Sequence, residues 1–258
     1  MNSGVPHSAR VYDYWLGGKD NFAVDRHVGE AMIKAIPGLR HMAEENRRFV
    51  HRAARDLVVE EGIRQFIDIG TGIPTPPNLH EVVQEIAAPA RVVYVDNDPL
   101  VLVHTRALMI SSPEGRCEYV SADLRDPASI LGDRPLLDTV DLTEPVGLTL
   151  IAVLMLLADA DDPWGKVTAL RDALPSGSCL AISHPTADFN PAEVDAAVAA
   201  ATDAGMTLVV RSKADVQRFF GDWELLNPGV VPVSGWRPDD SNVDPKAAYY
   251  WAGVARKP

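Results

Sequence analysis

Short apolar segments without polar alternation recur along the chain from residue 64 to residue 183. A strand with one buried face alternates apolar and polar residues, whereas a strand buried on both faces does not. Helix start signals such as Asp98-Pro99 and Asp162-Pro163 separate these segments. The pattern predicts an α/β fold with a parallel sheet covered on both faces. The segments span residues 64–69, 91–95, 118–120, 146–154 and 178–183.

The end of the chain departs from this alternation. Residues 223–233 and 247–255 have the composition of two strands joined by a polar, Pro-rich connection. A hairpin-like pair that closes a series of strands and helices predicts one antiparallel strand in the sheet.

The first 61 residues differ again. An aromatic and glycine-rich stretch, 10–22, precedes two expected helices over 23–61 that are broken near Pro37-Gly38. This part is too small for a core of its own. We therefore expect a helical lid or extension over 1–61, packed on a main α/β domain over 62–258.

Charge and composition limit the partners of the chain. The net charge is −12 at pH 7, whereas nucleic-acid-binding proteins usually present a basic surface. The start lacks a signal-peptide pattern, and the longest apolar run, 146–158, is too short for a bilayer. Cys117 and Cys179 fit no metal-ligand spacing. We expect a cytoplasmic protein with neither a nucleic-acid nor a membrane partner and no metal site; whether it forms a homo-oligomer stays open.

The first apolar segment ends in a glycine motif, DIGTG, from Asp68 to Gly72. Glycines allow a tight turn and close approach of a ligand at the carboxyl edge of a sheet, although GxG also fits a plain strand-to-helix turn. A dinucleotide fingerprint needs a third glycine and an immediate helix. Here Pro74 follows, and we expect the helix to start only near Asn78. The Asp68 carboxylate suits the ammonium group of S-adenosylmethionine (SAM) better than a phosphate.

Acids also follow the second and third segments. Asp96 is placed to accept hydrogen bonds from both ribose hydroxyls, which is common to folds that bind NAD and folds that bind SAM. Asp98 fits better as a helix N-cap. Asp123 could accept the exocyclic amine of adenine, or form an Asx-turn. Acids at three successive strand ends predict an adenosine ligand.

These motifs, with their spacing, resemble the Rossmann-like (class I) SAM-dependent methyltransferases. More narrowly, the chain resembles a bacterial SAM-dependent methyltransferase family formerly labelled a domain of unknown function. The resemblance implies a doubly wound, seven-stranded sheet whose last strand is antiparallel, with SAM as cofactor and S-adenosylhomocysteine (SAH) as product. It is carried by RVYDYWLGGKDNFAVDR, GIRQFIDIGTGIPTPPNLHEVVQ, ARVVYVDNDPLVLVHTRALM, PGVVPVSGWRP and AGVARKP.

The resemblance also implies roles for individual residues. Those implied to hold the cofactor are Asp68, Gly70 and Gly72 at the methionine end, Asp96 and Asn97 at the ribose, and Asp123 and Leu124 at the adenine. Those implied to cover it are Tyr14, Gly17, Gly18, Lys19 and Asn21. Many such enzymes carry a histidine or an aromatic residue after the fourth strand, where this chain has Leu154-Met155-Leu156.

Other polar residues have two interpretations each. His80 could meet the cofactor or be a solvated residue at a helix start. His184 is a candidate general base at a strand end, or a histidine bonded to a loop carbonyl. Tyr14 is the other candidate for catalysis. Asn46, Arg47 and Arg48 could bind an acidic acceptor, or form the solvated face of a helix.

The sequence predicts a SAM-dependent methyltransferase that acts on an unidentified, small-molecule acceptor. The alternative is a catalytically inactive SAM- or SAH-binding sensor or accessory protein, which the absence of a histidine or aromatic residue at Met155 favours. An NAD-dependent oxidoreductase is disfavoured by Pro74 and by the missing third glycine.

Overall fold

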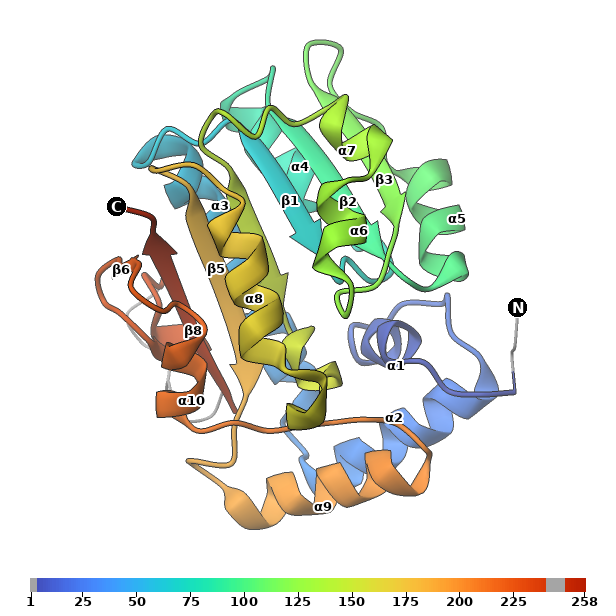
Figure 1. Ribbon diagram of the computed structural model, residues 1–258. Coiled ribbons are helices and arrows are strands. Elements are labelled where there is room, and N and C mark those ends of the chain that lie inside the picture. Colours follow the sequence, from blue (N-terminus) through green and yellow to red (C-terminus); the bar gives the residue numbers. More distant parts are fainter. Residues whose placement is uncertain (1–3, 240–248) are drawn as a thin grey trace.

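A mixed sheet with helices on both faces forms the centre of the protein (Figure 1). The computed structural model describes residues 4–239 and 249–258. In the order β3-β2-β1-β4-β5, the first five strands are parallel, and the order reverses between β1 and β4. A reversal of this kind marks the ligand-binding position of an open α/β sheet. The strands are β1 Gln65–Ile69, β2 Arg91–Asp96, β3 Arg116–Ser121, β4 Gly147–Ile151 and β5 Cys179–Pro185.

Both faces of β1, β2, β4 and β5 are buried, as the lack of polar alternation predicts, whereas the edge strand β3 is only partly buried. In β2, Val92 and Tyr94 belong to one hydrophobic cluster, and Val93 and Val95 belong to the other. Helices α3 (Leu39–Val59) and α4 (Leu79–Ile86) contribute to the first cluster. The second cluster takes side chains from α6 (Pro127–Leu131), α7 (Arg134–Leu137) and α8 (Pro163–Asp172), which lie on the opposite face (Figure 1).

The predicted helix starts are confirmed at the aspartate–proline pairs. Asp98 caps α5 (Pro99–Leu108) and accepts a hydrogen bond from the Leu100 N–H, and Asp162 caps α8 and accepts one from the Gly165 N–H. Asn78 precedes α4, and its N–H donates to the Glu81 carboxylate. Each cap satisfies a backbone group that the helix leaves without an internal partner.

The C-terminal strands complete the sheet with one difference from the prediction. Strand β8 (Tyr250–Arg256) lies antiparallel to β5, as expected. The strand expected over 223–233 is two short strands, β6 (Glu224–Leu225) and β7 (Val231–Pro232), and both pair with β8. The turn at Pro228-Gly229 separates them, and Gly229 has a φ of +84°. Residues 247 and 248 of the other expected strand lie outside the described residues.

A second difference concerns the apolar run after residue 146. The strand was expected to continue to Leu154, but β4 ends at Ile151. Ala152 adopts a φ of +51°, which turns the chain out of the sheet into a short 3-10 helix, Leu154–Leu156. This turn places Val153 against the loop that follows β1.

The N-terminal segment forms helix α1 (Ser8–Trp15), helix α2 (Ala23–Ala35) and helix α3. Side chains of α3, including the fully buried Phe49 and Leu57, share one hydrophobic cluster with Phe66 of β1, so α3 is one of the helices that cover the sheet. Helix α1 lies beyond the arrowhead ends of β1, β2 and β3 (Figure 1).

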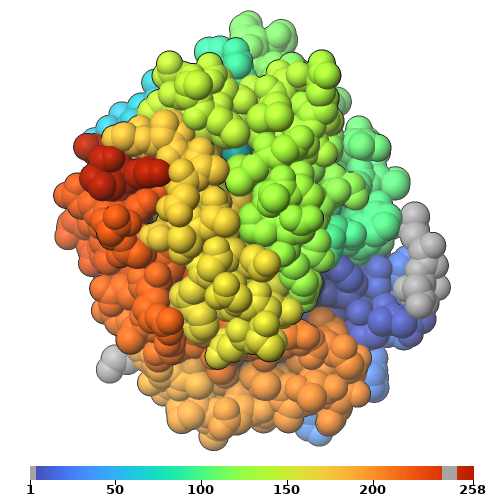
Figure 2. Space-filling model, viewed as in Figure 1, coloured from blue at the N-terminus to red at the C-terminus, as the bar shows by residue number. Residues whose placement is uncertain are grey.

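The first two helices also contact later parts of the chain. Helix α2 packs against α9 (Pro191–Asp203). In Figure 2 the N-terminal segment, in blue, is bordered by α9 in orange and by the green segment around α5. The N-terminal segment therefore packs against more than one part of the main domain.

The described residues contain no helix that is both long and apolar enough to cross a membrane. Within the same residues, no three or more His, Cys, Asp or Glu side chains are grouped so that they could hold a metal ion. Cys117 and Cys179 are free thiols, and burial raises the pKa of each to about 11 and about 12, respectively.

Replacing Arg52 with methionine should destabilise the protein. Arg52 lies in α3 and donates to the carbonyls of Trp236 and Val233 at 2.9 and 2.8 Å. The variant leaves both carbonyls buried without these donors, at a cost of about 2–4 kcal/mol, which should lower the Tm by about 4–12 °C. Circular dichroism during heating measures this change.

Arg55→Met is the matched control. Arg55 lies one turn further along α3, is half-exposed and pairs at 3.8 Å with the exposed Asp239. A pair of this kind contributes about 0–1 kcal/mol. A Tm for the Arg52 variant no lower than that of the Arg55 variant would contradict the anchoring role of Arg52.

Candidate functional site

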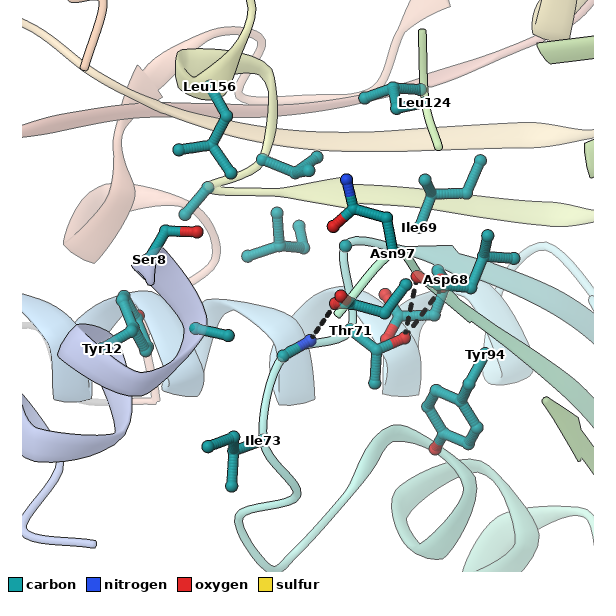
Figure 3. A pocket seen from close by; sticks show the side chains of 18 of the residues that line it. Ser8, Tyr12, Asp68, Ile69, Thr71, Ile73, Tyr94, Asn97, Leu124 and Leu156 are labelled. Carbon is teal, nitrogen blue, oxygen red and sulfur yellow. Dashed lines mark hydrogen bonds between the residues drawn. The ribbon is translucent and has the colours of Figure 1, made fainter. Parts of the chain in front are cut away.

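A cavity lies at the carboxyl edge of the parallel strands, under α1 (Figure 3). It holds about 1250 Å³ of empty space, its open mouth included. Helix α1 turns one face to it, because its lining residues recur at helical spacing. These residues are Ser8, Ala9, Tyr12, Asp13 and Leu16. The loops after β1, β2, β3 and β4 form the opposite wall, so the cavity occupies the position where open α/β sheets bind ligands.

The loop after β1 requires both of its glycines. Gly70 and Gly72 have φ angles of +77° and +67°, which are strained for other residues. A Cβ atom on Gly70 would lie 2.3 Å from Cγ2 of Val153, so the loops after β1 and β4 touch directly. A side chain at position 70 would therefore push these two loops apart, and the tightly packed glycine loop lines the cavity.

Asp96 ends β2 with its carboxylate fixed from two sides. The N–H of Gly72 donates to Oδ2, and the N–H of Asp98 donates to Oδ1, both at 2.9 Å. Burial raises the pKa of Asp96, although these hydrogen bonds act in the opposite direction. Each carboxylate oxygen has a second acceptor position, so the group can still bind a pair of hydroxyls.

Asp123 follows β3 and faces Asn97 across the edge of the sheet. The side-chain amide of Asn97 donates to Asp123 Oδ2 at 2.8 Å, and the N–H of Arg125 donates to Oδ1 at 2.8 Å. Burial alone would raise the pKa of Asp123, but these hydrogen bonds and the Arg125 charge outweigh it and lower the pKa. A carboxylate that stays ionised is suited to accept a hydrogen bond from an amine.

Asp68 lies deeper in the cavity, on the face of β1 that α3 covers. The hydroxyl of Thr149 donates to its Oδ1, and burial raises its pKa. The structure thus brings together seven residues that the sequence assigns to the cofactor. They are Asp68, Gly70, Gly72, Asp96, Asn97, Asp123 and Leu124.

The predicted N-terminal cover residues lie elsewhere. Tyr14, Gly17, Gly18, Lys19 and Asn21 are not among the residues that line the cavity. The Tyr14 hydroxyl bonds to Glu30, and the Arg40 guanidinium lies 4.7 Å from its ring centre. Tyr14 therefore faces away from the cavity and is not placed to cover a cofactor or to act in catalysis.

The GGKDN turn instead encloses Asp13. Asp13 Oδ2 accepts from the Asp20 N–H at 3.0 Å and from the Asn21 amide at 2.7 Å. A Cβ atom on Gly18 would lie 1.9 Å from Asp13 Oδ1, which explains why a glycine stands there. Lys19 is exposed. The GGKDN turn therefore fixes the end of α1, and Asp13, which it encloses, lines the cavity.

His80 is a buried residue of α4 that does not line the cavity. Its N–H donates to the Tyr94 hydroxyl at 2.8 Å, and its Nδ1 lies 2.9 Å from the same oxygen. Tyr94 lies between His80 and the cavity, and its ring lines the wall. His80 is therefore neither a solvated residue nor placed to contact a ligand in the cavity.

His184 is fully buried in β5 and has no face on the cavity. Its Nδ1 lies 2.9 Å from the carbonyl of Pro185, and Arg211 donates to its Nε2 at 2.9 Å. Burial lowers its pKa to about 3, so the ring is neutral with both nitrogens engaged. Arg211 also donates to the carbonyls of Leu154 and Leu157. His184 is therefore part of a structural network and is not placed to act as a general base.

Sequence reasoning missed Tyr12 and Tyr94 as cavity residues, and it left two interpretations for Asn46, binding of an acidic acceptor or a place on a solvated helix face; the second is wrong. Asn46 is 1% exposed and donates to the Tyr12 hydroxyl at 2.9 Å. The hydroxyl of Tyr12 donates in turn to the carbonyl of Ala43. The spacing of Ser8, Tyr12 and Leu16 would have indicated a helix face if residues 8–15 had been predicted as helical.

The doubly wound sheet, its glycine loop and the acids at three strand ends define a Rossmann-like protein with a site for an adenosine-containing cofactor. The sequence model of the S-adenosyl methyltransferase family matches residues 1–258, and the chain belongs to this family. SAM is accordingly its cofactor.

Solved structures agree with this assignment. A DUF574 family protein from Streptomyces avermitilis is 46% identical, with a TM-score of 0.97, and the match covers 100% of this chain and 99% of that one. A proposed methyltransferase from Thermobifida fusca is 40% identical, with a TM-score of 0.90, and covers 99% and 96%. Human N-acetylserotonin methyltransferase in complex with SAM shares the fold alone, at 13% identity, a TM-score of 0.50 and coverage of 98% and 63%. No curated protein matches the sequence.

The cavity fits SAM and lacks the features that bind a pyrophosphate. Gly70, Thr71 and Gly72 line the cavity, and Asp96 keeps acceptor positions for hydroxyls. Helix α4 begins only at Leu79, seven residues after Gly72, so no helix N-terminus follows the glycine loop directly.

Asp96→Ala should weaken SAH binding at least tenfold. The variant loses the carboxylate that we predict binds the ribose hydroxyls, and it frees the Gly72 N–H, which loosens the glycine loop. Charge-assisted hydrogen bonds contribute about 1.5–3 kcal/mol each, and about 1.4 kcal/mol corresponds to a tenfold change. Isothermal titration calorimetry measures the affinity, and Asp195→Ala, an exposed acid on α9, is the control. Equal affinities of the two variants would place the ribose elsewhere.

Proposed function

We propose that the protein is an active methyltransferase that transfers the methyl group of SAM to a small-molecule acceptor bound under α1. The observation that carries this proposal is the position of α1, whose inner face lies over the glycine loop and the cavity. Ala9 of α1 lies 4.0 Å from the position of a Cβ on Gly72. A covered cavity favours a small acceptor over a protein or a nucleic acid, which agrees with the net charge of −12.

The residues of the chain bind and orient the reactants in this proposal. Asp96 binds the ribose, Asp123 and Leu124 hold the adenine, and the Gly70 to Gly72 backbone lies along the methionine end. When bound, SAM supplies a methyl group on a sulfonium sulfur, which a nucleophile displaces in line, so that the sulfur keeps the bonding electrons and SAH remains. The acceptor gains the methyl group and, where its nucleophile is neutral, loses a proton.

The wall on the acceptor side is apolar. Leu16 comes from α1, and Met155, Leu156 and Leu157 come from the segment after β4. Such a wall excludes water from the reacting atoms and favours an acceptor with apolar surface. Since His184 and Tyr14 lie away from the cavity, alignment of acceptor and methyl group is the main contribution of the protein.

An inactive SAM-binding protein is not favoured by the fold or by the comparisons. That alternative depended on the missing histidine or aromatic residue near Met155. In the structure, Met155 lines the cavity, and its sulfur lies 3.9 Å from the hydroxyl of the buried Tyr250.

Turnover is tested with SAM labelled in its methyl group. The protein is incubated with a bacterial small-molecule extract and, separately, with the protein and nucleic-acid fractions. We expect the label in a low-mass product, with an equal amount of SAH, and several-fold less of this product with Asp96→Ala at a limiting SAM concentration. Label in a macromolecule would contradict the small-molecule proposal, and SAH binding without transfer to any fraction would support a sensor.

Hydrogen exchange tests the role of α1 as a cover. A ligand under α1 should hold the helix against the loops, so amide exchange across residues 12–22 should slow when SAH is added. Helix α9 lies away from the cavity-lining residues and serves as the internal control. If residues 12–22 exchange equally with and without SAH, α1 is a fixed structural arm.

A further inference from the structure

Two adjacent side chains of α3, Asn46 and Arg47, line the cavity and have buried polar atoms that lack partners. Asn46 uses its amide nitrogen to bind Tyr12, while its Oδ1 is buried without a hydrogen-bond partner among the described residues. Arg47 donates from one terminal nitrogen to the carbonyls of Thr75 and Pro77 at 2.8 and 3.0 Å. Its Nε is also buried, and no described residue pairs with it. Buried polar groups without partners are uncommon in folded proteins, so both atoms point to a ligand.

The unpaired atoms have complementary chemistry. Asn46 Oδ1 accepts hydrogen bonds, and the Arg47 Nε–H donates them and carries positive charge. Asp68 adds a second acceptor to the same cavity. Arg47 lines the same cavity, and its positive charge opposes the rise that burial causes in the pKa of Asp68. One donor and two acceptors match a group that carries both a carboxylate and an ammonium.

Arg47 is also the guanidinium best placed to receive a carboxylate. The other arginine on the cavity wall is Arg125. Its guanidinium pairs with Asp123 at 3.3 Å and donates to the carbonyl of Leu156 at 3.0 Å. Arg125 is therefore engaged at the adenine end, whereas Arg47 keeps a free N–H beside the glycine loop.

We propose that Asn46, Arg47 and Asp68 bind the amino-acid end of the cofactor. Arg47 binds the carboxylate, and Asn46 Oδ1 and Asp68 accept hydrogen bonds from the ammonium group. The proposal rests on SAM binding at the carboxyl edge, as set out above, and it assigns a cofactor-binding role to α3. An acidic group on the acceptor is the other source of a carboxylate, and the experiment distinguishes the two because it contains no acceptor.

The test compares two ligands that differ only at the amino-acid end. SAH carries it, whereas 5′-methylthioadenosine keeps the adenosine and the thioether but lacks the carboxylate and the ammonium. Calorimetry should show that Arg47→Ala weakens SAH by at least tenfold and 5′-methylthioadenosine by less than twofold. Asn46→Ala should weaken SAH selectively, to a smaller extent. Arg48→Ala, which removes an exposed arginine paired with Glu45, should leave both affinities unchanged.

The comparison separates binding from loop support. Arg47 also holds the Thr75 and Pro77 carbonyls, so its loss could loosen the glycine loop and weaken both ligands. Equal weakening of SAH and 5′-methylthioadenosine, or no change in either, would overturn the proposal while leaving SAM binding intact. Failure of the wild-type protein to bind SAH would overturn this proposal and the proposed function together. Thermal unfolding of each variant confirms that it is folded.

Discussion

The carboxylate of Asp96 connects the loops on which the cavity depends. Its two oxygens accept from the N–H groups of Gly72 and Asp98, so the turn after β2 holds the glycine loop after β1. Asp98 in turn caps α5 and pairs with His7, the N-cap of α1, at 3.1 Å and with Arg10 of α1 at 3.5 Å. One acidic turn thus positions the glycine loop, a helix start and the covering helix. Gly72 and Asp96, which these hydrogen bonds join, both line the cavity, so the wall of the cavity forms when the sheet and its loops fold.

The ends of the cavity differ in charge, which limits what it can bind. Asp96 and Asp123, which we propose bind the adenosine, bring negative charge that favours hydroxyl and amine donors and would repel a phosphate. Arg47 brings positive charge to the same cavity, which Asp68 also lines. A nucleoside joined to an amino acid has suitable groups for both sets of charges. A dinucleotide does not, because its phosphates would meet the acids and it has no amino-acid group for Arg47 and Asp68.

Local features of the sequence were sufficient for the five parallel strands, apart from the end of β4, and for the acids at their carboxyl ends. Asp96 and Asp123 were predictable because a parallel strand delivers its last residues to a known edge of the sheet. Tyr14 was assigned to the cofactor because residues 8–15 were not predicted as helical. In a helix, two residues correspond to about 200° of rotation, so Tyr14 points away from the cavity that Tyr12 faces. His184 could not be assigned either, since its partner Arg211 lies 27 residues later and no local pattern joins them.

Arg211 holds the segment after β4 by its backbone. It donates to the carbonyls of Leu154 and Leu157, and Asp159 and His184 keep its guanidinium in place. These hydrogen bonds help to fix the path of the segment through its backbone. Leu156 is only half-buried on the cavity wall, so its side chain can change in size or polarity while the loop keeps its shape, whereas Met155 is buried. Where the acceptor binds at this wall, as we propose, a chain built in this way can acquire a new acceptor through a few substitutions, without redesigning the cofactor site beside it.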